Sequence, residues 1–168
     1  MCQGEDEMPS ETEKQISYGV VPPEEARTYS GYELIKRILE GSLPAAAITK
    51  SLPFRLAEVE PGRAVFAGEP NSDLYNPLGS VHGGYAATLL DSAMGCAVHS
   101  MLPAGTGYTT LEFKISFLRP VTANTGPLRA EGKVISVGKR VGTAEGRLVD
   151  AEGKLYAHGT TTCLIFSL

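Results

Sequence analysis

Clustered basic residues, paired cysteines and long apolar runs are all missing from this sequence, and each absence excludes a class of protein. The 15 Lys and Arg residues are scattered along 168 residues with a net charge of −4, whereas a nucleic-acid-binding protein concentrates basic residues on one face. Cys2, Cys96 and Cys163 are far apart and odd in number, so they form neither a disulfide framework nor a CxxC metal site. We therefore expect no nucleic-acid partner, no metal and a reducing, cytoplasmic location.

The sequence also lacks the patterns of a secretory signal, a membrane span and a serine hydrolase. The first residues are acidic and polar, without the basic and then apolar stretches of a signal peptide. The longest weakly polar stretch, Gly83 to Leu102, contains Asp91 and His99, which membrane helices rarely accept. No G-x-S-x-G nucleophile elbow is present. We expect no membrane partner.

Composition divides the chain into three parts. Residues 1–28 contain a cluster of acidic residues, three prolines and few large apolar side chains, which predicts a flexible acidic N-terminal tail. Residues 29–52 are expected to be an accessory helical segment, because Ser30 and Glu33 form a capping-box pattern and Gly41 is a good helix stop. Residues 53–168 are the expected globular domain. The chain as a whole is 42% hydrophobic, which is enough for one buried core.

Within that domain, the pattern predicts a hairpin, a buried helix and then four antiparallel strands. The hairpin strands are 54–60 and 63–68, joined at Pro61-Gly62. Residues 82–101 are apolar nearly all round, which is typical of a buried helix. The later strands are expected at Thr110–Phe117, where apolar and polar residues alternate, and then in a meander at 128–137, 141–149 and 154–166. This order predicts an α+β fold in which a curved antiparallel β-sheet wraps around one long central helix.

The start of the predicted central helix carries the residues most suited to chemistry. Gly83 and Gly84 allow a ligand to approach the unpaired backbone N–H groups at the positive end of the helix dipole. Such a site suits a carbonyl oxygen that becomes negative during attack. Asp91 lies two turns further on and is the only acidic residue between Asp73 and Glu112. It is a candidate general base, although a buried Asp can also serve only to hold a core hydrogen bond.

Taken together, Asn76, Gly79, His82-Gly83-Gly84 and Asp91 resemble the signature of the PaaI-like acyl-CoA thioesterases, a branch of the hotdog-fold superfamily. The resemblance extends from about residue 54 to 166. It implies a hotdog fold, hydrolysis of a small-to-medium acyl or aryl-acyl coenzyme A without a cofactor, and homodimers that assemble into homotetramers. It also implies an active site at the dimer interface, with Asn76 and Asp91 from different subunits.

The same resemblance assigns the catalytic residues. Asp91 matches the general base or nucleophile, Gly83 the N–H that polarises the thioester carbonyl, and Asn76 the side chain that positions water or carbonyl. Thr110 matches a Ser or Thr beside the carboxylate, with Thr109 as the alternative if the register differs.

The sequence gives less support for the substrate-binding residues than for the catalytic residues. His82 and Gly84 belong to the same turn, where His82 is either a turn-fixing residue or a base. Arg119, Lys139 and Arg140 are cations at strand or turn ends that could meet the phosphates of coenzyme A, or else be solvated charges.

Two other functions stay open on the sequence. A hotdog module could bind acyl-CoA without turnover, as a sensor or scaffold, but the first fifty residues show no basic helix-turn-helix to accompany it. A hotdog dehydratase would pair a His with an acid, and the nine-residue spacing of His82 and Asp91 does not place them together on a helix. His99 and His158 have no neighbours at metal-ligand spacing.

Overall fold

The computed structural model describes residues 16–168, and ordered structure begins earlier than the sequence predicts. Of the expected tail at residues 1–28, residues 1–15 lie outside the described residues. Residues 16–28 contain strand β1 (Tyr18–Gly19) and helix α1 (Pro23–Thr28), so the expectation of a tail is wrong for this part. The reason is tertiary: β1 gains backbone hydrogen bonds by pairing in parallel with β2 (Ala45–Ala46).

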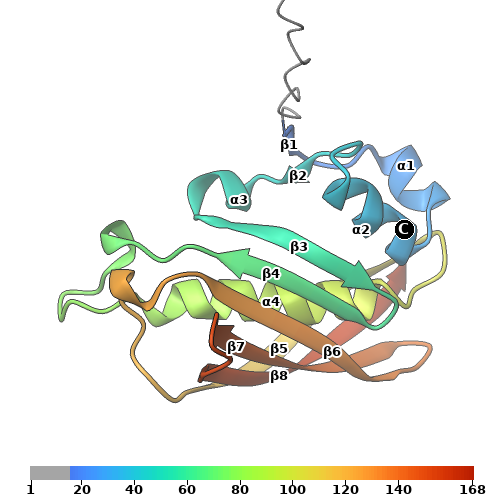
Figure 1. Ribbon diagram of the computed structural model, residues 1–168. Coiled ribbons are helices and arrows are strands. Elements are labelled where there is room, and N and C mark those ends of the chain that lie inside the picture. Colours follow the sequence, from blue (N-terminus) through green and yellow to red (C-terminus); the bar gives the residue numbers. More distant parts are fainter. Residues whose placement is uncertain (1–15) are drawn as a thin grey trace, which may run out of the picture.

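Residues 29–52 contain α2 (Gly31–Leu39) as their main helix and the four-residue α3 (Ile48–Ser51) near their end. The predicted capping box is confirmed, since the Ser30 N–H donates to Glu33 Oε2 at 2.9 Å and the Glu33 N–H donates to Ser30 Oγ at 3.3 Å. Leu34 and Ile35 form the buried face of α2. Figure 1 shows this segment lying across the edge of the main sheet, beside β3.

The main sheet has six antiparallel strands in the order β3-β4-β6-β7-β8-β5. β3 and β5 are therefore its two edges. The strands are β3 (Phe54–Glu60), β4 (Arg63–Gly68), β5 (Thr106–Phe117), β6 (Leu128–Val137), β7 (Val141–Asp150) and β8 (Leu155–Ser167). Short 3-10 turns, Ser72–Leu74 and Ala123–Thr125, occur in the connections. Strands β6 to β8 form the predicted meander, but β5 pairs with β8 at the far edge.

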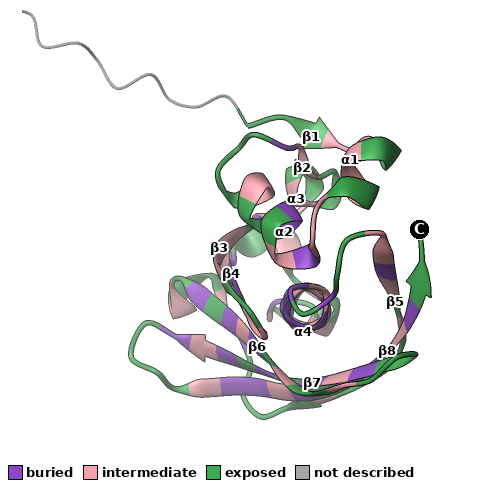
Figure 2. Ribbon diagram, turned by 90° about the vertical axis from the view of Figure 1, so that its right-hand side faces the viewer, coloured by how far each residue is buried: buried purple, intermediate pink, exposed green. Residues whose placement is uncertain are grey.

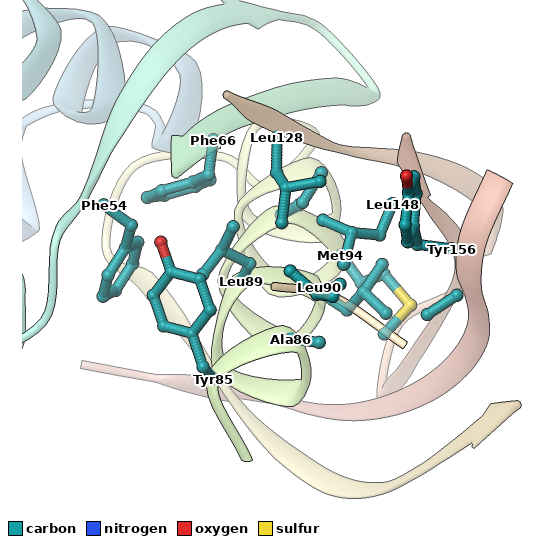
Figure 3. Packing of buried hydrophobic residues seen from close by; sticks show 14 of the residues in the cluster. Phe54, Phe66, Tyr85, Ala86, Leu89, Leu90, Met94, Leu128, Leu148 and Tyr156 are labelled. Carbon is teal, nitrogen blue, oxygen red and sulfur yellow. The ribbon is translucent and has the colours of Figure 1, made fainter. Parts of the chain in front are cut away.

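Helix α4 (Gly83–His99) is the predicted central helix. Seen end-on in Figure 2, the sheet curves around it. Leu89, Leu90 and Met94 are fully buried against Leu128 and Leu148 of the sheet, as Figure 3 shows. The predicted arrangement of one long helix wrapped by a curved antiparallel sheet is confirmed.

The alternating pattern predicts that Thr110 and the apolar side chains of β5 lie on opposite faces of the sheet. A β-bulge at Leu111 changes this arrangement. Strict alternation would place Thr110 and Ile115 on opposite faces. Instead Thr110 is opposite Cys163 while Glu112 is opposite Thr162, so one extra residue enters β5. Thr110 and Ile115 therefore both face α4, and Leu111 itself is 57% exposed.

Candidate active site

The N–H of Gly83 at the N-terminus of α4 is an unused backbone donor among the described residues. His82 is the N-cap residue, and its Nδ1 accepts a hydrogen bond from the Gly84 N–H at 2.9 Å. Among residues 16–168, no hydrogen bond uses the N–H of Gly83 as donor. Because the helix dipole adds positive potential here, Gly83 can donate to a carbonyl oxygen or an oxyanion. The Gly84 N–H is already occupied.

The side chain of Asn76 shapes the loop that precedes α4. Its Oδ1 accepts from the N–H groups of Leu78 at 2.9 Å and Ser80 at 3.3 Å, and its Nδ2 donates to Ser80 Oγ at 2.9 Å. Gly79 has φ +82°, a backbone conformation that favours glycine. In a single chain, Asn76 thus holds the loop, and its contact with substrate stays a prediction.

A cavity of about 320 Å³, the α4 N-terminal cavity, lies beside this loop and brings three predicted residues together: Asn76, Gly83 and Arg119. The ring of Phe117 covers Gly83 closely, since its Cζ lies 3.2 Å from where a Cβ on Gly83 would be. The guanidinium of Arg119 donates to the carbonyl of Leu155. The cavity thus combines room for a ligand, a backbone donor and a cation at one place.

Asp91 lies two turns into α4 and is half-buried. Its Oδ1 accepts a hydrogen bond from Thr110 Oγ1 at 2.9 Å. The structure places Thr110, and not the exposed Thr109, against this carboxylate. The bulge at Leu111 makes this contact possible, because it turns Thr110 toward α4 while the rest of β5 keeps its apolar side chains on the same face. No hydrogen bond within residues 16–168 uses Asp91 Oδ2, which leaves that oxygen available to a water molecule or a substrate.

One chain does not bring Asp91 and Gly83 to the same reacting group. They are eight residues apart on one helix, which corresponds to about 12 Å along the axis. Asp91 is not among the residues that line the α4 N-terminal cavity. A base and an oxyanion donor must both lie about 3 Å from the reacting atoms, so the two halves of the site are separate within a single chain.

The three predicted phosphate-binding cations also fall into two places. Arg119 follows the C-terminal end of β5, whereas Lys139 and Arg140 form the exposed turn between β6 and β7. That turn lies at the opposite end of β5, since Val141 pairs with Leu164, which in turn pairs with Thr109. In one chain only Arg119 is near Gly83.

The surroundings of three other titratable groups, His99, Cys96 and His158, indicate structural roles. Burial lowers the pKa of His99, whose ring packs against that of Tyr108 at 5.2 Å between centroids. Burial also raises the pKa of the Cys96 thiol to about 12, which keeps it uncharged. His158 Nε2 lies 3.6 Å from Glu145 Oε2 on the sheet surface.

Across residues 16–168, no group of three or more His, Cys, Asp or Glu residues could hold a metal ion. No helix in this part of the chain is long and apolar enough to cross a membrane.

Phe117 and Ser80 are site residues that the sequence analysis missed. Phe117 ends the alternating β5 pattern and looked like ordinary core, yet it is 57% exposed and covers Gly83. Its position at the end of the strand, two residues before Arg119, was the available signal. Nothing in the local sequence marked Ser80 as the partner of Asn76, because that contact depends on the loop's three-dimensional closure.

Comparison with known proteins gives consistent matches. A family model described as the thioesterase superfamily matches residues 78–157. A Saccharolobus solfataricus protein that carries a provisional esterase name is 35% identical over 123 residues, which cover 73% of this chain and 86% of that protein. Among the curated relatives, the matched regions span from 44% to 86% of the relative's length.

Solved structures agree with this arrangement. A phenylacetic acid degradation-related protein from Ralstonia eutropha superposes with a TM-score of 0.69 at 31% identity, over 77% of this chain and 97% of that one. The E. coli PaaI protein from the phenylacetic acid degradation operon superposes with a TM-score of 0.71 at 24% identity, over 82% and 94% of the two chains. The second likeness concerns the fold alone.

Proposed function

This chain belongs to the thioesterase superfamily and is a thioester hydrolase with the hotdog fold, and we propose that its substrate is a small-to-medium acyl or aryl-acyl coenzyme A. The products would be the free acid and coenzyme A. The observation that carries the proposal is the pair formed by Asp91 and Thr110 on the concave side of the sheet, where one carboxylate oxygen stays available. The unused N–H of Gly83 supplies the matching donor for the carbonyl.

The site would work by polarising the carbonyl and supplying an oxygen nucleophile. The Gly83 N–H donates to the thioester oxygen and stabilises the negative charge that develops there. Asp91 either takes a proton from water, whose oxygen then attacks the carbonyl carbon, or attacks that carbon itself and forms an anhydride that water hydrolyses. In both routes the C–S bond breaks, and the thiolate of coenzyme A leaves and takes up a proton. Thr110 positions the carboxylate.

We propose that the two halves of the site come from two subunits of a homodimer. The separation of about 12 Å between Gly83 and Asp91 along α4 requires a second chain, if both act on one carbonyl. Strand β5 is a free edge of the sheet in one chain, and three apolar side chains near it are exposed: Leu111, Phe113 and Phe117. Pairing of two β5 edges would cover these side chains and satisfy the open backbone groups. Assembly of such dimers into a homotetramer is part of the same proposal.

The coenzyme A part of the substrate would extend out of the site past Arg119, which lines the α4 N-terminal cavity together with Gly83. A guanidinium can bind a phosphate with two hydrogen bonds. Lys139 and Arg140 would take part only if a neighbouring subunit supplies them. The free thiols of Cys96 and Cys163 suit a reducing compartment such as the cytoplasm.

The test of this function is a panel of acyl-CoA thioesters of varied chain and ring, with thiol release as the readout. We expect turnover of several members, and a loss of about 10²–10⁴-fold in kcat for Asp91→Asn with an unchanged circular dichroism spectrum. If several thioesters bind to the wild-type protein and none is hydrolysed, the catalytic proposal is wrong, and a non-catalytic acyl-CoA-binding module is the remaining function.

A single turnover in heavy-oxygen water separates the two chemical routes. Label recovered in the Asp91 carboxylate, read by mass spectrometry of the peptide, indicates direct attack. Label recovered only in the product acid after excess enzyme has turned over once arises from general-base catalysis or from water attack at the acyl carbon of the anhydride. Mass spectrometry of the rapidly quenched Asp91 peptide separates these two cases, because only the anhydride route leaves an acyl group on Asp91.

A further inference from the structure

A second and larger cavity, of about 630 Å³, lies between residues 16–52 and the β3 edge of the sheet. We name it the N-terminal cavity. It is bounded on one side by α2 and β2, and on the other by β3, β4 and Cys96 of α4. The match to the family model begins only at residue 78, so this cavity depends on a segment outside that match. Its volume falls within the range of about 300–1,000 Å³ typical of small-molecule sites.

The N-terminal cavity has a largely apolar lining. The walls are formed by Ile35 of α2 and by Phe54, Leu56 and Phe66 of the sheet, with the two phenylalanine rings 5.9 Å apart. Burial keeps the Cys96 thiol neutral, so it adds to the apolar surface. Glu40, Arg55 and Glu69 are the charged residues among those that line it. Such a cavity favours an uncharged hydrocarbon group over a sugar, a phosphate or a carboxylate.

Cys96 is the residue of α4 that lines this cavity. It lies five residues after Asp91 on α4, about 7.5 Å along the axis. Cys96 also contacts Tyr108 of β5 through its side chain, on the same strand face as Thr110. Asp91 does not line the cavity, so a hydrocarbon chain that starts at a carbonyl beside Asp91 would have to extend along α4 past Cys96 to enter it. An acetyl group is too short to cover this distance.

The preceding part of the chain is a poor alternative occupant. Five of the fifteen residues before Ile16 are acidic: Glu5, Asp6, Glu7, Glu11 and Glu13. Burial of these carboxylates without partners would be strongly unfavourable.

We propose that the N-terminal cavity receives the acyl chain of the thioester substrate, and that residues 16–52 make the enzyme selective for uncharged aliphatic acyl groups of medium length. This inference rests on the proposed function, which supplies the carbonyl position beside Asp91. Each methylene group that enters the cavity should improve kcat/KM by about fourfold, once the chain is long enough to pass Cys96.

The experiment is a chain-length series with a cavity-filling variant and a matched control. Acetyl-, butanoyl-, octanoyl- and dodecanoyl-CoA are hydrolysed by the wild-type protein, by Ala45→Phe and by Ala47→Phe. Ala45 lines the cavity and is half-buried, whereas Ala47 is exposed and does not line it. Thr49→Trp, from α3, fills the same cavity from a second position. Thermal unfolding checks that each variant is folded.

We expect kcat/KM of the wild-type protein to rise from butanoyl- to octanoyl-CoA by at least tenfold. Ala45→Phe and Thr49→Trp should lose most of that gain and leave acetyl-CoA hydrolysis unchanged, while Ala47→Phe behaves as the wild type. Equal effects of the cavity-filling variants on all chain lengths, or no dependence on chain length, would overturn the inference while the hydrolase proposal stands.

Calorimetric titration with dodecanoate tests whether the cavity binds an apolar chain, independently of hydrolysis. Binding by the wild-type protein that Ala45→Phe abolishes, without turnover of any thioester, would support an apolar-chain site and refute the hydrolase proposal. Absence of dodecanoate binding, in a protein that hydrolyses all four thioesters equally, would refute the cavity's role alone.

Discussion

At the scale of single residues, the hydrogen bond between Thr110 Oγ1 and Asp91 Oδ1 can be tested by an isosteric change. Thr110→Val removes the donor and keeps the shape of the side chain. A hydrogen bond to a charged group contributes about 1.5–3 kcal/mol, so kcat should fall roughly ten- to a hundredfold. The matched control is Thr109→Val, on the exposed side of the same strand. Steady-state thiol release measures both, and an equal effect of the two variants would contradict a positioning role for Thr110.

His99 provides a residue-scale prediction of pH dependence. Burial holds its folded-state pKa below the ordinary 6.5, so near pH 6.5 and below the unfolded chain takes up a proton that the folded chain does not. The resulting stability is complete above pH 6.5 and is lost as pH falls from there toward the folded pKa. His99→Phe keeps a ring against Tyr108 and should flatten the fall of Tm between about pH 7 and 5.

The control for this experiment is His158→Gln, which changes a partly exposed histidine beside Glu145. Thermal unfolding followed by circular dichroism at each pH gives the comparison. If His99→Phe loses stability on acidification as steeply as the wild type does, titration of His99 is not the cause.

At the scale of elements, contact between α4 and the sheet depends on Gly132 of β6. A Cβ there would lie 2.3 Å from the carbonyl oxygen of Ala93 and 2.6 Å from the N atom of Met94, so Gly132→Ala must push helix and sheet apart. Overpacking of this kind lowers the free energy of unfolding by about 1–3 kcal/mol. Gly138→Ala is the control, since its Cβ would meet only ordinary contact at 3.5 Å. Urea unfolding measures both, and equal midpoints would show that α4 does not pack this tightly on β6.

Elements were predictable from sequence where local chemistry decides them. Pro61 and Gly62 mark the hairpin turn, and Gly62 has φ +80°, so the bounds of β3 and β4 follow directly. The bulge at Leu111 was not predictable, because an inserted residue leaves no local mark on an alternating pattern. The contact of Thr110 with Asp91 came from the family resemblance, not from the strand's periodicity, which would have allowed Thr109.

Long-range contacts were also beyond local reasoning. The place of β5 beside β8 and the parallel pairing of β1 with β2 depend on segments far apart in sequence. The N-terminal cavity depends on the same contacts, because it lies between a segment that was expected to be accessory and the edge of the main sheet.

At the scale of the whole molecule, the proposed site requires two subunits, and each half can be removed separately. Gly83→Pro deletes the N–H at the first position of α4, where proline is well tolerated. Gly83→Ala is its control, because it keeps the N–H and makes the same contact with Phe117. We expect Gly83→Pro to lose about 10²–10³-fold in kcat and Gly83→Ala to keep most of its activity. Asp91→Asn removes the other half.

Mixing the two inactive proteins then tests whether the site is shared. In a mixed dimer, one site combines Gly83 of the Asp91→Asn subunit with Asp91 of the Gly83→Pro subunit and is intact, while the other site carries both defects. Random reassociation makes half of the dimers mixed, so about a quarter of all sites should be active. Denaturing and refolding the equimolar mixture should therefore restore thiol release to about one quarter of the wild-type rate. If the mixture stays inactive while refolded wild type recovers fully, Asp91 and Gly83 do not meet across a subunit interface.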